Sequence, residues 1–159
     1  MKIRIICIGK LKEKYWMSAA AEYSKRISGY ANIEIVELKE SKLPSNPSEA
    51  DENSVLIREG RNILSKIKES DHVIAMEVEG EQLDSVELAK KIQCVFDTKS
   101  STIDFVIGGS LGLSDEVKKR ADYGLSFSKM TFPHQMARIM LLEQIYRAFK
   151  INSGETYHK

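Results

Sequence analysis

The sequence predicts an α/β fold in which a mostly parallel β-sheet is covered by helices on both faces. Short apolar runs typical of buried strands alternate with longer segments whose apolar residues recur at helical spacing. This alternation favours a parallel sheet, because each helix returns the chain to the edge where the next strand begins. At 159 residues, 42% of them hydrophobic and 30% charged, the chain is expected to form one domain over residues 1–159.

The first half of the chain is expected to contain two strands and two helices. An isoleucine-rich strand, Lys2–Gly9, ends at a glycine, and residues 13–27 place an apolar stripe on one face of a helix. A second strand, Ile33–Leu38, precedes a polar loop with two prolines over residues 41–53. That loop leads into a helix over Val55–Ile67.

The second half continues the alternation and closes with a long helix. Strands are expected at His72–Met76, Ile103–Ile107 and Leu125–Ser128. Helices are expected at Ser85–Phe96, Ser114–Ala121 and Pro133–Ile151. Ser114 suits a helix N-cap, but Val117 stands where a full capping box requires an acidic residue or glutamine, so only half of that motif is expected.

Three loops should meet at one edge of the sheet. Residues 77–80, 108–113 and 129–134 follow the third, fourth and fifth predicted strands. In parallel sheets, ligands bind beyond the carboxyl ends of the strands. Gly108 and Gly109 remove side chains where backbone would approach a ligand, although a glycine pair also serves as a simple turn from strand to helix.

Several classes of site are absent from the sequence. Neither the G-x-G-x-x-G dinucleotide fingerprint nor the G-x-x-x-x-G-K-[ST] phosphate loop occurs, and no histidine stands beside a nucleophile elbow. No cysteine–histidine cluster has metal-ligand spacing, so no metal is expected. What remains is a ligand held by backbone groups and an apolar slot, such as adenine joined to a thioether or sulfonium chain.

Composition narrows the cellular setting. Cys7 and Cys94 lie in apolar runs and are expected to be reduced core residues, which favours the cytoplasm. No signal peptide or membrane-spanning run is present, so no membrane partner is expected.

Residues 118–159 carry 8 Lys and Arg against 3 Asp and Glu, a balance of +5 within a net charge of +1. Such a region suits a polyanion, although similar imbalances also arise on solvated surfaces.

The last helix and the tail carry further candidate residues. At about 100° per residue, apolar side chains cover an arc of about 200°, which predicts a homodimer through this helix or, alternatively, a helix sandwiched within one subunit. Arg138 lies in the middle of the arc, and a buried guanidinium needs a partner, either a structural carboxylate or a substrate phosphate. Tyr157, His158 and Lys159 are either a frayed end or groups that bind a nucleic-acid base.

Four ordered motifs occupy the second half of the chain. They are Val106–Ser114, Leu125–His134, Glu143–Lys150 and Gly154–Lys159. These motifs closely resemble the ribosomal RNA large subunit methyltransferase H family, which consists of knotted, S-adenosylmethionine-dependent SPOUT enzymes. The similarity extends over essentially the whole chain, including the opening Met1-Lys-Ile-Arg-Ile.

The resemblance implies a C-terminal trefoil knot whose loops wrap S-adenosylmethionine. It implies methylation of N3 of a pseudouridine in 23S rRNA by a cytoplasmic homodimer that acts on assembled ribosomes. By the family pattern, the cofactor contacts fall on Met76, Gly108, Phe127, Ser128, Lys129, Met130, Thr131 and Phe132.

The catalytic expectations follow from the acceptor. N3 of pseudouridine is a weak acid, so a base or a stabiliser of its anion must assist transfer. We expect Arg138 to hold the anion or a phosphate, and His158 or Tyr157 of the partner subunit to order the base. His134 is another candidate base and equally suits a structural role. Two other functions fit the sequence: a non-enzymatic RNA-binding ribosome-assembly factor and a knotted tRNA methyltransferase.

Overall fold

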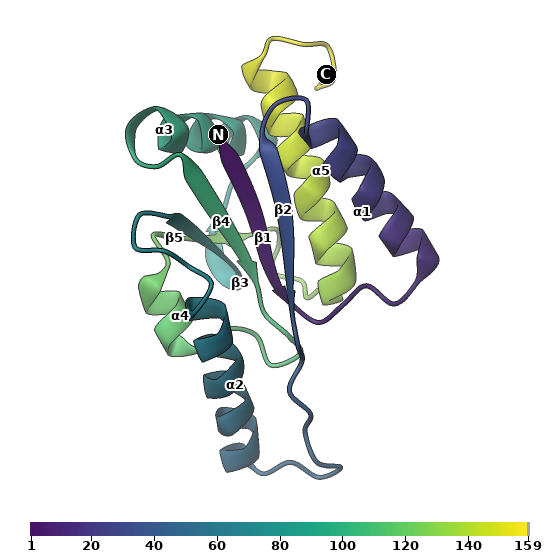
Figure 1. Ribbon diagram of the computed structural model, residues 1–159, viewed down its shortest axis with the longest axis vertical. Coiled ribbons are helices and arrows are strands. Elements are labelled where there is room, and N and C mark those ends of the chain that lie inside the picture. Colours follow the sequence, from purple (N-terminus) through teal and green to yellow (C-terminus); the bar gives the residue numbers. More distant parts are fainter. Residues whose placement is uncertain (159) are drawn as a thin grey trace.

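The computed structural model describes residues 1–158 and contains a five-stranded sheet in the order β2-β1-β4-β3-β5, in which every pair of neighbouring strands is parallel (Figure 1). The strands are β1 (Lys2–Ile8), β2 (Asn32–Leu38), β3 (His72–Gln82), β4 (Thr102–Ile107) and β5 (Tyr123–Ser126). The helices are α1 (Lys14–Ile27), α2 (Glu49–Leu64), α3 (Ser85–Thr98), α4 (Asp115–Arg120) and α5 (His134–Asn152). The predicted α/β class and parallel sheet are confirmed.

Helices cover both faces of the sheet, as the alternation predicts. On one face, α1, α3 and α5 pack against side chains such as Ile5 and Phe105; on the other, α2 and α4 pack against Ile6 and Val106 (Figure 1). Adjacent strand residues point to opposite faces, so these near-continuous apolar strands fill two cores at once. Within residues 1–158, no helix combines the length and the apolar character needed to cross a bilayer.

The structure corrects the predicted start of one helix and confirms the predicted cap of another. α2 begins at Glu49 rather than Val55, because Ser48 and Asp51 form a complete capping box in which each side chain accepts a hydrogen bond from the other's backbone N–H. At α4, Ser114 Oγ accepts the Val117 N–H at 3.4 Å, and the reciprocal half of the box is missing, as the sequence predicts.

The predicted loop over residues 77–80 is wrong, because β3 continues to Gln82. Leu125 of β5 is aligned first with Met76 and then with Glu81, and the intervening residues form an irregular bulge. A bulge inserts extra residues into one strand while pairing resumes beyond it. β3 therefore loops out after Met76 and returns to pair with the end of β5.

The final helix is packed between α1 and α3 (Figure 1). Its inner residues, including Leu141 and Ile145, are fully buried, whereas Ile139 and Tyr146 are half-buried. Much of the wide apolar arc is thus covered within one subunit. Cys7 is buried and free, as predicted, but Cys94 is free and exposed on α3, so the prediction that it belongs to the core is wrong.

A buried ion cluster joins two strands, β1 and β4, to the turn that precedes β3, near the amino ends of the sheet. Arg4 donates from Nε to Asp104 Oδ1 at 2.7 Å and from Nη2 to Asp104 Oδ2 at 2.5 Å and Asp71 Oδ2 at 2.7 Å. Asp104 is fully buried, and burial raises the pKa of its carboxyl group while Arg4 opposes that rise. Removing either partner would leave an uncompensated buried charge.

We predict that Asp104→Ala lowers the free energy of unfolding by about 3–5 kcal/mol, because Arg4 loses its main partner in the interior. The matched control is Glu34→Ala, which removes the exposed ion pair with Lys2 and should cost less than about 1 kcal/mol. Urea denaturation of both variants measures the difference. An equal loss of unfolding free energy in the two variants would contradict the prediction that the buried cluster contributes more than the exposed pair.

Candidate active site

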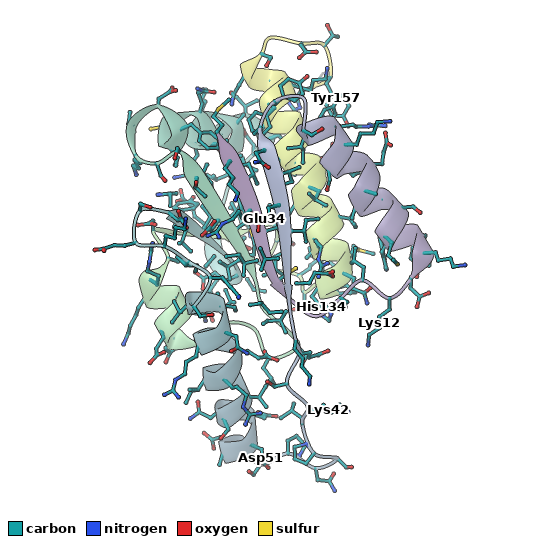
Figure 2. The ribbon with its side chains drawn as sticks, viewed as in Figure 1. Lys12, Glu34, Lys42, Asp51, His134 and Tyr157 are labelled. Atoms are coloured by element: carbon teal, nitrogen blue, oxygen red, sulfur yellow. The ribbon has the colours of Figure 1, made fainter. Side chains whose placement is uncertain are left out.

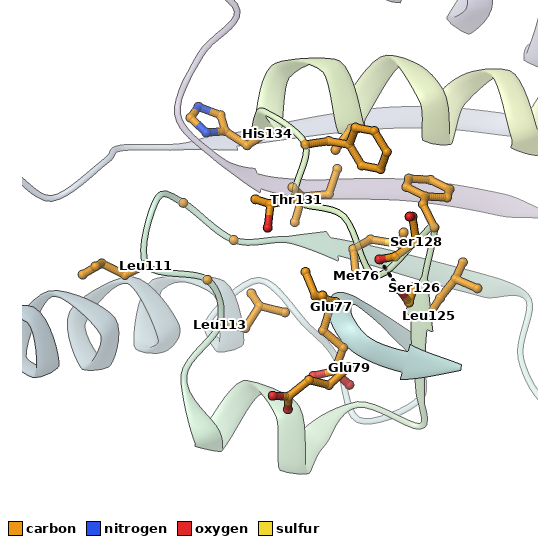
Figure 3. A pocket seen from close by; sticks show the side chains of 18 of the residues that line it. Met76, Glu77, Glu79, Leu111, Leu113, Leu125, Ser126, Ser128, Thr131 and His134 are labelled. Atoms are coloured by element: carbon orange, nitrogen blue, oxygen red, sulfur yellow. Dashed lines mark hydrogen bonds between the residues drawn. The ribbon is translucent and has the colours of Figure 1, made fainter. Parts of the chain in front are cut away.

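A cavity of about 410 Å³ opens at the carboxyl edge of the sheet (Figure 3). Its walls come from the end of β3, the loop after β4, the loop after β5 and the first turn of α5. The side chains are mostly apolar, with two glutamates and one lysine at the border. The main lining residues are Met76, Glu77, Val78, Glu79, Ile107, Gly108–Leu113, Lys118, Leu125–Ser128, Met130–Phe132, His134 and Ala137.

The glycine loop is shaped by backbone that lies against backbone. A Cβ added at Gly108 would lie 2.4 Å from the carbonyl oxygen of Gly112, and the Gly112 N–H donates to Gly109 O at 3.0 Å. Gly112 has a φ of +81°, in the region that favours glycine. The loop therefore folds back on itself along the cavity wall, so the glycine pair is more than a simple turn from strand to helix.

The loop after β5 forms the opposite wall. The buried Ser126 Oγ donates to Ser128 O at 3.0 Å, and Ser128 Oγ accepts the Met130 N–H at 3.1 Å (Figure 3). These short-range bonds fix a bend that brings Phe127 and Phe132 to the cavity. Side-chain oxygens that bond nearby backbone groups are typical of such turns.

The structure brings together seven of the eight residues predicted to contact the cofactor. These are Met76, Gly108, Phe127, Ser128, Met130, Thr131 and Phe132. Lys129 is exposed and is not among the lining residues, because the bend at Ser128–Met130 leaves it on the solvent side of the loop.

The β3 bulge closes the third side of the cavity. A Cβ at Gly80 would lie 2.8 Å from backbone atoms of Gly124 and Leu125, so only glycine permits this crossing. The Glu77 carboxylate lies where a Gly124 side chain would project, and Lys118 Nζ is 3.8 Å from its Oε2. The bulge thus places carboxylates beside an apolar slot.

α2 supports the glycine loop from behind through Glu59, which sequence reasoning missed. Glu59 is 4% exposed; its Oε1 accepts the Ser41 N–H at 2.9 Å, and its Oε2 lies 3.2 Å from the position of a Gly109 Cβ. Burial raises the pKa of this carboxyl group. An acidic residue in an amphipathic helix gives no sequence signal of such burial.

Arg138 is buried at the start of α5. Its Nη1 donates to Glu37 Oε2 at 2.8 Å and its Nη2 donates to Gly9 O at 3.0 Å, while its Nε has no hydrogen-bond partner among the described residues. Of the two partners considered for Arg138, the structure contains the carboxylate. The guanidinium thereby joins the start of α5 to the carboxyl ends of β1 and β2, next to the cavity residue Ala137.

The described part of the tail, up to His158, folds against α5 at the end opposite His134 (Figure 2), and Lys159 lies outside the described residues. Tyr157 Oη donates to Glu143 Oε1 at 3.2 Å, and the Arg147 guanidinium lies 4.7 Å from the centre of the Tyr157 ring. His158 Nδ1 is 3.4 Å from Arg147 Nη1. Burial and the Glu143 carboxylate raise the pKa of Tyr157, so its phenol stays protonated at neutral pH.

His158 also borders a second cavity of about 560 Å³, which extends between the start of α3 and the middle of α5. The two cavities share Leu125, Ser126 and Phe127 as a common wall. Glu143 lies in this second cavity as well. Glu143 and Arg147 were missed by sequence reasoning, although their spacing of four residues on a helix predicts an ion pair, which the structure shows at 2.6 Å.

The first cavity has the chemistry that an adenosyl cofactor with a sulfonium chain requires. Glycine backbone suits the edges of a purine, the apolar residues suit its faces, and the carboxylates at the border suit cationic groups. Within residues 1–158 no three histidines, cysteines or acidic residues come together as metal ligands.

Comparison with known proteins decides the family. The family model described as "Predicted SPOUT methyltransferase" matches residues 1–158. The chain belongs to the SPOUT methyltransferase family. As a member of that family it is a methyltransferase, and the parallel sheet with its carboxyl-edge cavity is the SPOUT fold as it occurs in this chain.

Relatives match this SPOUT chain along its full length. "Ribosomal RNA large subunit methyltransferase H 1" of Clostridium perfringens and "Ribosomal RNA large subunit methyltransferase H" of Bacillus cytotoxicus are each 56% identical over 100% of both chains. The protein of the same name from Clostridium novyi is 57% identical over the same extent. A solved structure of a probable methylase family protein from Haemophilus influenzae covers 99% of this chain and 70% of its own, with a TM-score of 0.55 and 18% identity, and so supports the fold.

We predict that Gly108→Ala weakens binding of S-adenosylmethionine at least about tenfold, equivalent to about 1.4 kcal/mol, because the new Cβ would collide with Gly112 O and move the loop. Gly29→Ala is the control, since its Cβ would meet nothing closer than 3.6 Å. Titration calorimetry of both variants gives the affinities. Unchanged affinity in Gly108→Ala would place the cofactor elsewhere.

We predict that Glu59→Gln is more stable than the parent chain at neutral pH. A carboxyl group whose pKa is raised in the folded state binds more protons folded than unfolded, so its charged form lowers stability as pH rises through that pKa. Glutamine keeps an acceptor for Ser41 N–H without the buried charge. Melting curves between pH 4 and pH 8 should show the gain grow with pH; a constant difference would contradict this reading.

Proposed function

We propose that this SPOUT methyltransferase transfers a methyl group from S-adenosylmethionine to N3 of a pseudouridine in 23S rRNA of the ribosome, in the cytoplasm. The observation that carries the proposal is the cavity between the glycine loop and the bend after β5, in a chain whose full-length relatives are named for ribosomal RNA of the large subunit. The free cysteines agree with a reducing compartment.

Residues of three loops would hold the cofactor. The glycine loop offers backbone at close range, and Met76, Phe127 and Phe132 offer an apolar enclosure for adenine. Glu77 and Glu79 lie at the border, where a carboxylate suits a ribose hydroxyl or the ammonium group of the methionine part. When bound, S-adenosylmethionine supplies a methyl group already activated on a sulfonium, so the protein contributes mainly positioning.

The acceptor requires handling of one proton. As the N–CH₃ bond forms, the C–S bond breaks and the N3 proton must leave, so groups that stabilise the uracil anion speed the step. Tyr157 is a protonated phenol and His158 carries a ring nitrogen beside the second cavity, so both suit contacts to the base edge. We propose that they order the base, and that buried Arg138 acts by positioning α5 or, in the assembled enzyme, by holding the anion or a phosphate.

The active unit is proposed to be a homodimer with a C-terminal knot. α5 keeps half-buried apolar residues, including Met136, Ile139 and Met140, that a second copy would cover. Docking through α5 would bring the partner's tail toward the shared wall of the two cavities. The family membership supports the knot, in which the loop after β5 would be threaded before α5 begins.

We predict that His158→Ala lowers the rate of methyl transfer to ribosomes about 100-fold or more, the scale of a lost acid–base or ordering group, while affinity for S-adenosylmethionine stays within twofold. His134→Ala is measured beside it, because His134 borders the first cavity and is the other candidate base. Radioactive methyl transfer and calorimetry measure the two effects. Wild-type rates for both His158→Ala and Arg138→Ala would overturn the proposed roles.

The RNA that accepts the methyl group distinguishes the proposed function from the two alternatives, a tRNA methyltransferase and a ribosome-assembly factor. Assembled 70S ribosomes, free large subunits, naked 23S rRNA and tRNA are offered with the same methyl donor, and modified nucleosides are identified by mass spectrometry. The proposal expects N3-methylpseudouridine in ribosomal RNA. Methylated tRNA would indicate a tRNA enzyme, and binding to ribosomes without methyl transfer would indicate an assembly factor.

A further inference from the structure

A basic and aromatic segment lies next to the start of α5, and none of its residues belongs to the proposed cofactor site. We name residues 10–15, Lys-Leu-Lys-Glu-Lys-Tyr, the lysine segment; it runs from the loop after β1 into the first turn of α1. Lys10, Lys12, Lys14 and Tyr15 are all exposed, and Tyr15 is exposed to 64%. None of these residues lines either cavity described above.

Contacts with the start of α5 hold the lysine segment near His134, which lines the first cavity. The Lys12 N–H donates to Gln135 Oε1 at 3.1 Å, and His134 Nε2 lies 3.9 Å from the position of a Gly9 Cβ. Leu11 N–H donates to Glu37 Oε2 at 3.2 Å, the carboxylate that also pairs with Arg138. In Figure 2, Lys12 and His134 lie near the start of α5, and Tyr157 lies beyond the opposite end of that helix.

The charges of the segment are not neutralised by the protein. Among the described residues, Lys10, Lys12 and Lys14 take part in no salt bridge, whereas Lys2, Arg26, Arg147 and Lys150 each have a carboxylate partner. Glu13 is the one acid within the segment, and Glu37 is engaged by Arg138, so three cations face solvent against one local anion. Unpaired cations next to a cavity raise the local concentration of polyanions.

We propose that the lysine segment is an RNA-binding surface that holds the phosphate backbone beside the target nucleotide. Lysines that contact phosphates supply sequence-independent affinity, and an exposed aromatic ring such as Tyr15 stacks on an unpaired base. Trp16 supports that ring, with the two ring centres 5.0 Å apart in an edge-on arrangement. This inference rests on the proposed function and specifies how a chain of 159 residues holds a large RNA.

A nucleic acid fits this surface better than a second protein chain. Lysine is depleted in the cores of protein–protein interfaces, because burying an ammonium group without a partner is costly. Lys129 is a further exposed cation, on the loop that forms another wall of the same cavity.

The test replaces three charges and leaves the cofactor site unchanged. In the triple variant K10Q/K12Q/K14Q we expect the KM for ribosomes to rise about tenfold or more, and the salt dependence of kcat/KM to become shallower by about three log units per log unit of salt, one for each lost phosphate contact. The kcat at saturating ribosomes and the affinity for S-adenosylmethionine should stay within twofold. The control K66Q/K68Q/K99Q removes three exposed lysines that precede β3 and β4. These lysines lie at the amino ends of the strands, opposite the cavity.

A second pair of variants tests the aromatic contact. Tyr15→Ala should raise the KM for ribosomes about tenfold, and Tyr15→Phe should restore it, because phenylalanine keeps the stacking face. Wild-type KM and salt dependence in the triple variant would overturn the inference. So would sedimentation showing that the triple variant has lost a dimer formed by the parent chain, which would make the segment a protein interface. Failure of the proposed function looks different: the parent chain itself would bind no S-adenosylmethionine and methylate no ribosomes.

Discussion

The site depends on two places where backbone crosses backbone without an intervening side chain. Gly80 lets the β3 bulge lie on Gly124 and Leu125, and Gly108 lets its loop fold onto Gly112. Each contact would be broken by a single Cβ, since the atoms it would meet belong to backbone that cannot swing aside. The positions of the cavity walls therefore depend on these two close backbone contacts. The walls in turn position the polar groups at the border of the cavity.

The parallel sheet supplies the second condition, because all its carboxyl ends meet at one edge. Arg138 and Glu37 join the start of α5 to β1 and β2 there, and buried Glu59 lies behind Gly109 on the opposite face of the sheet. A buried charge is costly unless it is paired, so the Arg138–Glu37 pair keeps α5 in one position relative to the two strands. Charges that RNA would meet, such as Lys12, remain at the surface.

Much of this architecture could be predicted from sequence because the signals are local. Buried strands, helix periodicity and the glycine and serine–phenylalanine loops all lie within short windows, and seven of the eight expected cofactor residues line one cavity. The bulge after Met76 could not be predicted, since its pairing depends on Leu125, about fifty residues away. Burial of Glu59 and exposure of Cys94 likewise depend on tertiary packing. The capping box at Ser48 and Asp51, by contrast, is a local sequence pattern that could have been predicted and was missed.

A crystal structure of the chain grown with excess S-adenosylmethionine tests the central claim most directly. The account predicts density for an adenosyl group between Gly108–Gly112 and Phe127–Phe132. Density at another place on the molecule, or a cavity closed by repacked side chains while the donor is bound elsewhere, would contradict it.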